Sequence, residues 1–259
     1  MHADWIVPDW PAPASVRAVC TTRHGGVSVP PYDSLNLGDH VGDDGADVVR
    51  NRYVLAQAVQ ARPVFLQQVH GSAVAQLGLD TPDGTQADGC VATQAGVGCT
   101  IMVADCLPVL FTDSAGSAVA AAHAGWRGLA GKDGPGVIEN VAHSLWKAMH
   151  ATRAAAAGKT IAWLGPCIGP QAFEVGDEVR NAFVSQQPEA AAMFKPHGHG
   201  MWLADLQGLA RLRLQALGVT RIHGNDGSAG WCTVSNPSRF FSHRRDRVSG
   251  RFAACVWLS

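Results

Sequence analysis

Residues 104–128 carry the pattern that most constrains the fold of this chain, because two apolar runs are joined there by a short turn. The runs are Leu107–Thr112 and Ser117–Ala122. The segment between them, Asp113-Ser-Ala-Gly116, is rich in residues that favour turns. An apolar run, a turn and a second apolar run predict an antiparallel β-hairpin.

This hairpin makes a prediction about two reactive side chains. If its midpoint lies between Ser114 and Ala115, then Cys106 and His123 lie directly opposite each other. Opposite residues have Cα atoms ~4.5–5.5 Å apart and project from the same face of the sheet. That spacing suits two ligands of one metal ion or a Cys–His catalytic pair, although a β-bulge would shift the register.

A third candidate ligand, His70, follows an expected strand and comes directly before Gly71. Functional side chains often emerge where a rigid strand ends in a loop. Together with Cys106 and His123, it makes a set of two nitrogens and one sulfur. Three protein ligands and one open position are typical of catalytic zinc. A plain structural role stays open, since a strand-end histidine and a cysteine in an apolar run are both common without a metal.

The rest of the chain alternates expected strands and helices. Strands are expected, besides the hairpin, over 16–22, 64–69, 73–77, 98–103, 161–164, 219–223 and 252–258. Helices are expected from a cap at Asp43 or Asp44 to Gln60, and over 135–150, 177–186 and 205–217. A loop rich in Gly, Pro, Asn and Asp covers 23–42. We find no internal repeat and no linker, so we expect one α/β domain over residues 1–259.

Composition excludes several classes of protein. Of the 259 residues, 47% are apolar and only 16% are charged, which excludes a long disordered polyelectrolyte. A net charge of −1 argues against a general nucleic-acid-binding protein. No apolar run approaches the ~20 residues of a membrane span, and the first residues lack a secretory leader. The seven cysteines contain no C-x-x-C pair, which argues against ribbon-type zinc sites and favours reduced thiols in the cytoplasm.

Several short motifs follow one another in an order that resembles a known family. They include Thr21–Ser28, Ser34–Gly38, Gln68–Gly71, Ala87–Gly89, Ala104–Val109, His123–Gly128, Gly165–Pro170, Phe173–Val175, Asp205-Leu206, Phe240–Asp246 and Gly250-Arg251. Over nearly the whole chain, the sequence resembles the YfiH family, long labelled laccase-domain or polyphenol-oxidase proteins. One departure is His243, which stands where the family often has tyrosine.

The resemblance implies a fold, a metal site and an activity. The fold would be a layered α/β/β/α sandwich, similar to the catalytic domain of cytotoxic necrotizing factor. His70, Cys106 and His123 would hold zinc, with copper as the alternative metal. The activity would be phosphorolysis of purine nucleosides, namely adenosine, inosine, guanosine and methylthioadenosine, together with adenosine deamination. Members of the family are also described as peptidoglycan editing factors.

Five further residues are candidates for binding the nucleoside and phosphate. Guanidinium groups match phosphate oxygens, which favours Arg23, Arg127 and Arg244. Asn36 is expected to hydrogen-bond ribose or base. Asp105, beside the cysteine, is expected to orient a ligand histidine or hold a proton. We expect small-molecule partners only, and a monomer or weak homodimer.

Four alternative functions can be compared with the sequence. A Cys–His hydrolase would use Cys106 as nucleophile and His123 as base, and would suit the editing of peptidoglycan precursors. A multicopper oxidase needs paired H-x-H patterns, whereas this chain has one, His197-Gly-His199. A deaminase of the cytidine type would need an H-x-E and P-C-x-x-C signature, which is absent. A metal-stabilised binding protein without turnover is the non-enzymatic alternative.

Overall fold

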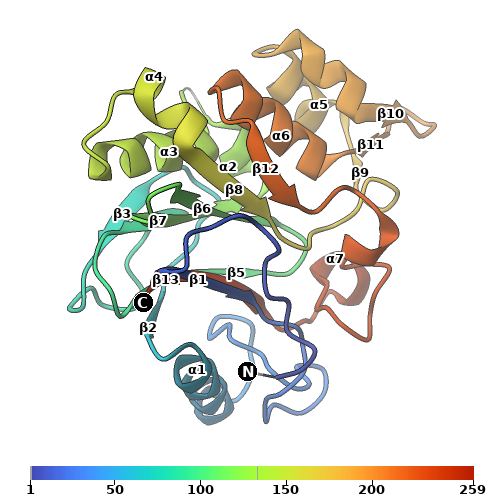
Figure 1. The fold of residues 1–259 in the computed structure, drawn as a ribbon. Coiled ribbons are helices and arrows are strands. Elements are labelled where there is room, and N and C mark those ends of the chain that lie inside the picture. The colour runs from blue at the N-terminus through green and yellow to red at the C-terminus, as the bar shows by residue number, and fades with distance from the viewer. Residues whose placement is uncertain (1, 133) are drawn as a thin grey trace.

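A computed structural model describes residues 2–132 and 134–259 as a mixed α/β protein with three sheets (Figure 1). The four-stranded sheet has the order β1-β13-β5-β2. Its strands are β1 (Val16–Cys20), β13 (Phe252–Leu258), β5 (Val97–Val103) and β2 (Arg62–Phe65). Strand β13 runs antiparallel to both neighbours, whereas β2 runs parallel to β5.

The larger sheet has six strands in the order β12-β8-β6-β7-β4-β3. They are β12 (Arg221–Gly224), β8 (Thr160–Leu164), β6 (Leu107–Asp113), β7 (Val119–Ala124), β4 (Gly89–Ala92) and β3 (Val74–Leu77). The outermost pairs are parallel and the central pairs antiparallel. Every residue of β6 and β7 is buried, as expected for strands covered on both faces.

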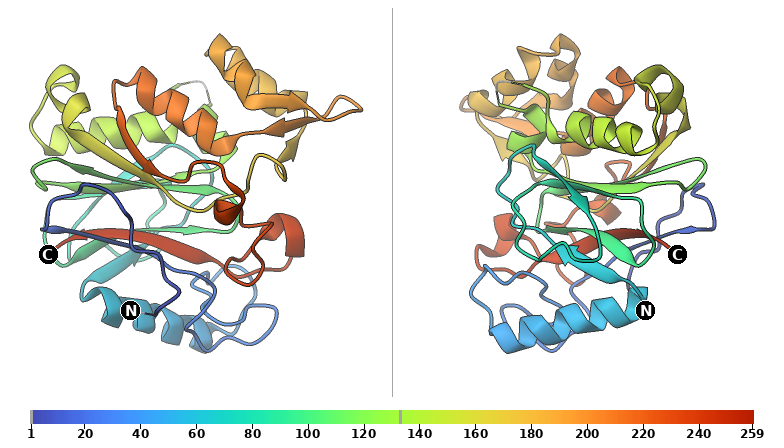
Figure 2. Two further views of the ribbon diagram at one scale, coloured as in Figure 1. Left: turned by 45° about the vertical axis from the view of Figure 1, so that its right-hand side comes forward. Right: turned by 90° about the vertical axis from the view of Figure 1, so that its left-hand side faces the viewer.

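Helices cover the outer faces of the two large sheets, which pack against each other (Figures 1 and 2). Helix α1 (Gly45–Val59) lies below the four-stranded sheet, and α3 (Val137–Ala148) and α6 (Leu206–Ala216) lie above the six-stranded sheet. Three apolar clusters fill the spaces between these layers. The mixed α/β class is therefore confirmed, whereas likeness to cytotoxic necrotizing factor stays a prediction.

Shorter elements complete the fold. The helices are α2 (Trp126–Ala130), α4 (Arg153–Ala156), α5 (Asp177–Val184) and α7 (His243–Asp246), with 3-10 turns over Ala157–Lys159, Pro188–Met193 and Ala229–Trp231. The small sheet has the order β10-β11-β9, formed by Phe194–Pro196, Trp202–Ala204 and Glu174–Val175. No helix among the described residues combines the length and apolar character needed to cross a bilayer.

The predicted helices are confirmed within a few residues at their ends. Helix α1 illustrates why: the side chain of Asp44 accepts a hydrogen bond from the backbone N–H of Ala46 (2.7 Å) and caps the helix. Its buried residues recur at helical spacing, as Val48, Leu55 and Val59 show. The strand expected over 64–69 is instead β2 at 62–65, and β4 and the small sheet were not predicted.

The predicted register of the hairpin is wrong by two residues. His123 lies opposite Pro108, not opposite Cys106. The carboxylate of Asp113 accepts a hydrogen bond from the backbone N–H of Ser117 (2.7 Å), so Ser117 belongs to the turn and β7 begins later. A shift of two residues keeps side chains on the same face, since only a shift of one reverses them. The cysteine and histidine therefore still meet.

Candidate metal centre and substrate cavity

The structure brings together the three side chains that were proposed as metal ligands. His123 lies near the end of β7, Cys106 directly precedes β6, and His70 lies in the loop after β2. One potential ligand atom from each residue lies within 4.8 Å of the other two. The Sγ atom of Cys106 is 3.7 Å from Nε2 of His70. Three separate segments of the chain thus converge on one point at the ends of strands.

A buried carboxylate, Asp88, holds both histidines in place. Its Oδ1 lies 2.8 Å from Nδ1 of His123 and accepts a hydrogen bond from the backbone N–H of His70 (2.9 Å). Its Oδ2 accepts from the backbone N–H groups of Val69 (3.1 Å) and Gly71 (2.7 Å). Burial raises the pKa of Asp88, but the hydrogen bond and charge of His123 and these N–H groups outweigh burial and lower it. The Nε2 atom of His123 is left for a metal.

Cys106 and His123 favour the charged pair, thiolate and imidazolium. Burial alone would raise the pKa of Cys106, but the charge of His123 and hydrogen bonds with His123 and His70 lower it to about 6. Burial likewise opposes charge on His123, but the thiolate and Asp88 raise its pKa to about 9. A thiolate is the form that acts as a metal ligand or a nucleophile.

The cluster has the donor atoms and the spacing that one metal ion requires. Tetrahedral zinc, with Zn–S of about 2.3 Å and Zn–N of about 2.0–2.1 Å, would separate these two ligand atoms by roughly 3.6 Å. The observed distance from Sγ of Cys106 to Nε2 of His70 is 3.7 Å. The Asp88–His123 contact supplies the carboxylate partner that metal-bound histidines usually have. One metal ion can therefore be held by His70, Cys106 and His123.

The space around the cluster depends on Gly125 and on two unusual backbone conformations. A Cβ atom at position 125 would lie 2.9 Å from Sγ of Cys106 and 3.0 Å from Cδ2 of His70, so one or both of these side chains would have to move. His70 has a φ of 60° and Asp105 a φ of 86°, a region that non-glycine residues rarely adopt. Such conformations concentrate at functional sites, where the surrounding contacts enforce them.

A cavity of about 470 Å³ opens beside the cluster. One part of its wall is apolar and is formed by Trp126, Ile168, Phe173 and Leu206. Four arginines also face the cavity, namely Arg127, Arg244, Arg247 and Arg251. Apolar walls with a few placed polar groups are typical of sites for small molecules. The arrangement suits a ligand with a flat apolar part and an anionic part.

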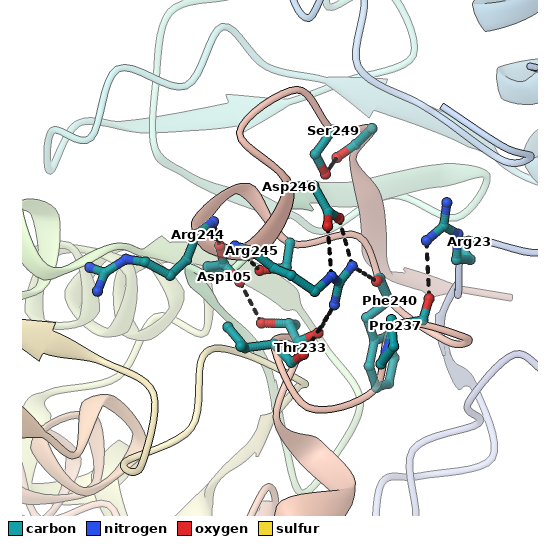
Figure 3. Close-up of polar contacts among 12 residues, drawn as sticks. Arg23, Asp105, Thr233, Pro237, Phe240, Arg244, Arg245, Asp246 and Ser249 are labelled. Carbon is teal, nitrogen blue, oxygen red and sulfur yellow. Dashed lines mark hydrogen bonds and ion pairs between the residues drawn. The ribbon is translucent and has the colours of Figure 1, made fainter. Parts of the chain in front are cut away.

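Of the residues expected to bind substrate, Arg127, Arg244 and Asp105 line the cavity. The guanidinium of Arg127 stacks 4.5 Å from the ring centroid of Trp126. Among the described residues, Asp105 forms no hydrogen bond with His70 or His123, so the predicted orienting contact is not seen, while the alternative role of holding a proton stays a prediction. Its two carboxylate oxygens accept hydrogen bonds from Thr233 Oγ1 and from the backbone N–H of Arg244, each at 2.6 Å (Figure 3).

Arg23 and Asn36 do not appear among the described residues that line the cavity. The guanidinium of Arg23 donates to the carbonyl of Asp33 (2.8 Å) and to that of Pro237 (3.0 Å). Figure 3 places Arg23 and Arg244 at opposite ends of the view. Asn36 is fully buried, and its Oδ1 accepts from the backbone N–H of Arg251 (2.8 Å). This placement does not support the predicted contacts of these two residues with substrate.

Three residues that the structure places at the site have no role predicted from the sequence. Asp88 was present in the Ala87–Gly89 motif, and Arg251 in the pair Gly250-Arg251. The sequence signal that could have indicated a role for Asp88 is its position as an acidic residue between two strand-forming segments. Arg247 lies in no motif, and nothing in the local sequence distinguishes it from the arginines beside it.

Comparison with known proteins extends these observations. Residues 17–259 match the family described as multi-copper polyphenol oxidoreductase laccase. The chain is 50% identical to the purine nucleoside phosphorylase PA4543 of Pseudomonas aeruginosa and 47% identical to the purine nucleoside phosphorylase YfiH of Escherichia coli. Each match covers 98% of both chains. The crystal structure of NMB0706 from Neisseria meningitidis, of family DUF152, has a TM-score of 0.88 and 44% identity, covering 99% of both chains.

Proposed function

This chain belongs to the YfiH laccase-domain family, and on that premise we propose that it is a purine nucleoside phosphorylase. The observation that carries the proposal is the cavity, which joins an apolar, partly aromatic wall and several guanidinium groups to the His70–Cys106–His123 cluster. A purine ring packs well on apolar and aromatic side chains. Guanidinium groups bind phosphate oxygens. The family description names an oxidase, but this cavity suits a nucleoside and phosphate.

The proposed reaction transfers the ribosyl group from a purine to phosphate. A phosphate oxygen forms a bond to C1′ while the bond between C1′ and N9 breaks. The electron pair of that bond goes to the purine, which takes up a proton. The products are the free base and ribose 1-phosphate, or 5-methylthioribose 1-phosphate when the substrate is methylthioadenosine. The substrates we propose are adenosine, inosine, guanosine and methylthioadenosine.

The metal we propose is zinc, with copper as the alternative. His70, Cys106 and His123 would hold it, and the spacing of their ligand atoms fits tetrahedral coordination. When bound, zinc supplies Lewis-acid stabilisation of negative charge. Asp88 orients both histidines, and its hydrogen bond with Nδ1 of His123 fixes the tautomer.

Arg127 and Arg244 are proposed to border the purine. Arg127 stacks on Trp126, and the guanidinium carbon of Arg244 lies 5.7 Å from the ring centroid of Phe173. The Nη1 atom of Arg244 also donates to the carbonyl of Glu174 (3.0 Å), which fixes the side chain beside the apolar wall. Adenosine deamination is a proposed side activity, in which water replaces the amino group at C6 and ammonia leaves.

Product analysis with adenosine tests the proposal. The purified, metal-loaded protein is incubated with adenosine, with and without phosphate, and the products are separated. We expect adenine and ribose 1-phosphate only when phosphate is present, and inosine where deamination occurs. The His70→Ala variant should lose both metal and phosphorolysis. Full phosphorolysis by a metal-free His70→Ala variant would refute the role of the cluster.

A second candidate function is hydrolysis by a Cys–His pair, which the lowered pKa of Cys106 favours. Cys106 would attack the carbonyl carbon of an amide or ester in a peptidoglycan precursor, and His123, as the base that has taken the thiol proton, would pass it to the departing amine or alcohol. Water would then hydrolyse the thioester and release the acid. Metal analysis separates the two functions. One zinc per chain that protects Cys106 from alkylation supports the phosphorylase, whereas a metal-free protein alkylated rapidly at Cys106 supports the hydrolase. The cytoplasmic location, the oligomeric state and a single domain over 1–259 stay predictions.

A further inference from the structure

The arginines of the cavity carry an excess of positive charge. Among residues 2–132 and 134–259, none of the four cavity arginines has a carboxylate oxygen within 4.0 Å of its guanidinium group. The acidic residue that lines the cavity is Asp105, and both its oxygens already accept hydrogen bonds. A concave site with unpaired guanidinium groups attracts anions.

These four arginines form two different pairs. Arg127 and Arg244 lie against the aromatic rings of the apolar wall. Arg247 and Arg251 belong to the segment after α7, and neither is stacked on an aromatic ring in the described part of the chain. The guanidinium groups of Arg247 and Arg251 therefore do not stack on the apolar wall that suits a purine.

Arg251 is held rigidly at both ends. Its backbone N–H donates to Oδ1 of Asn36 (2.8 Å), and its Nη1 donates to the carbonyls of Ser249 (2.8 Å) and Gly250 (3.0 Å). Among the described residues its Nε and Nη2 have no hydrogen-bond partner, and these two donors can bind two oxygens of one anion. Burial lowers the pKa of Arg251, while the charge of Cys106 raises it, as expected for a guanidinium close to the cluster.

Arg247 is held in a conformation that disfavours an ordinary side chain. Its φ is 63° and its ψ is −58°, and its backbone N–H donates to the carbonyl of His243 (2.9 Å) at the end of α7. His70 and Asp105, which face the same cavity, also have positive φ. Glycine would adopt this backbone conformation with less strain, so position 247 presents a charged side chain to the cavity from a backbone that disfavours one.

We propose that Arg247 and Arg251 form the subsite for a tetrahedral oxyanion, inorganic phosphate, next to the metal cluster. This inference rests on the proposed phosphorylase function and assigns its second substrate to a place separate from the apolar wall. It also gives Asn36 a role, because Asn36 positions Arg251 instead of touching the nucleoside.

Binding of inorganic phosphate to the zinc-loaded protein, measured by titration calorimetry in a phosphate-free buffer, tests this assignment. We expect Arg251→Gln to raise the Kd for phosphate roughly tenfold or more, and Arg251→Lys to restore part of the affinity. Arg247→Gly should also raise this Kd, while raising the melting temperature because glycine relieves the strain. The matched control is Arg211→Gln, since Arg211 is half-buried, donates to backbone carbonyls and lies outside the cavity.

The kinetic readout is the KM for phosphate against the KM for adenosine. The variants at 247 and 251 should raise the KM for phosphate and leave the KM for adenosine within about threefold of its value in the unmodified protein. Unchanged phosphate affinity in folded Arg247→Gly and Arg251→Gln, or no binding of phosphate to the unmodified protein, would overturn the subsite. If phosphate binds and the variants weaken it, but adenosine is not cleaved, the subsite stands and the phosphorylase proposal fails.

Discussion

Asp88 and Asp105 are both buried, both follow an alanine and both precede a strand, yet they organise different regions of the site. Asp88 binds three successive backbone N–H groups of the His70 loop and the ring of His123. Asp105 binds Thr233 and the backbone of Arg244, and so fixes the start of α7. The two regions show that the role of a buried carboxylate is decided by the hydrogen-bond donors that the fold brings to it. One region holds the candidate metal ligands, and the other holds the arginine segment.

The largest effect on metal affinity and stability is expected from Asp88→Asn, which removes the carboxylate that holds His70 and His123. The amide cannot accept all the N–H groups that the carboxylate accepts, and the charge partner of His123 is lost. We expect metal affinity to fall tenfold to a hundredfold and the free energy of unfolding to fall by about 3–5 kcal/mol. Zinc content after dialysis and urea unfolding measure the two effects.

A matched control for this variant is Asp113→Asn, at a buried aspartate that also accepts backbone N–H groups, in the hairpin turn. It should destabilise the protein while metal affinity stays unchanged. Equal loss of metal in both variants would mean that Asp88 acts only through overall stability.

Asp105→Asn should affect the arginine region and spare the metal region. Asparagine tolerates the positive φ of this position, so the variant removes the charge without disturbing the backbone. The loss of one acceptor should lower the free energy of unfolding by about 1–3 kcal/mol and weaken phosphate binding. Zinc content should equal that of the unmodified protein. A loss of zinc would mean that Asp105, like Asp88, supports the metal cluster.

A smaller effect is expected on the pH dependence of Cys106 alkylation, which should differ between the Asp88 and Asp105 variants. In chelator-treated protein the thiolate of Cys106 forms as pH rises through its lowered pKa, so its alkylation rate should reach half of its maximum near pH 6. The other cysteines are buried, and burial raises the pKa of Cys255 to about 12. Asp88→Asn should move the midpoint upward, because His123 is then less easily protonated, while Asp105→Asn should leave it in place. The measurement is iodoacetamide labelling of Cys106 read by mass spectrometry, and a midpoint near that of a free thiol in every variant would contradict the thiolate–imidazolium pair.

The smallest effect is expected from Arg23→Gln, which lies in neither region. The variant loses an ion pair with Asp33 and hydrogen bonds to carbonyls, so the free energy of unfolding should fall by about 1–2 kcal/mol. The KM for phosphate and the kcat of phosphorolysis should stay within twofold of the unmodified protein. A tenfold rise in the KM for phosphate would show that Arg23 contributes to substrate binding.

The elements that the sequence predicts well are those with local signals. Asp44 caps α1, and the repeat of Val137, Val141 and Leu145 marks the buried face of α3. The start of β7 was misplaced because Asp113 reaches into the turn, which the pattern of apolar residues does not reveal. The two-residue strand β9 was missed because it is too short to show an alternating pattern.

The three candidate metal ligands were identified because each lies in a recognisable motif, and the family resemblance itself is confirmed. The supporting contacts join positions that are far apart in sequence. His123 meets Asp88 across 35 positions, and Arg251 meets Asn36 across 215. No local pattern indicates which polar residues will meet over such distances. Asn36 and Arg23 were predicted to bind substrate, whereas their hydrogen bonds support other segments of the fold, a placement that does not support that prediction.

The place of β13 in its sheet has a consequence for synthesis of the chain. Strand β13 is the last in sequence, yet it lies between β1 and β5, which leave the ribosome long before it. Until β13 arrives, the edges of β1 and β5 that it will join lack their partner and can pair with other chains. His70, Cys106 and His123 are synthesised early, whereas Arg251 precedes β13 directly. A nascent chain therefore carries its candidate metal ligands well before its full set of cavity arginines, and the cavity beside them is completed only as translation nears its end.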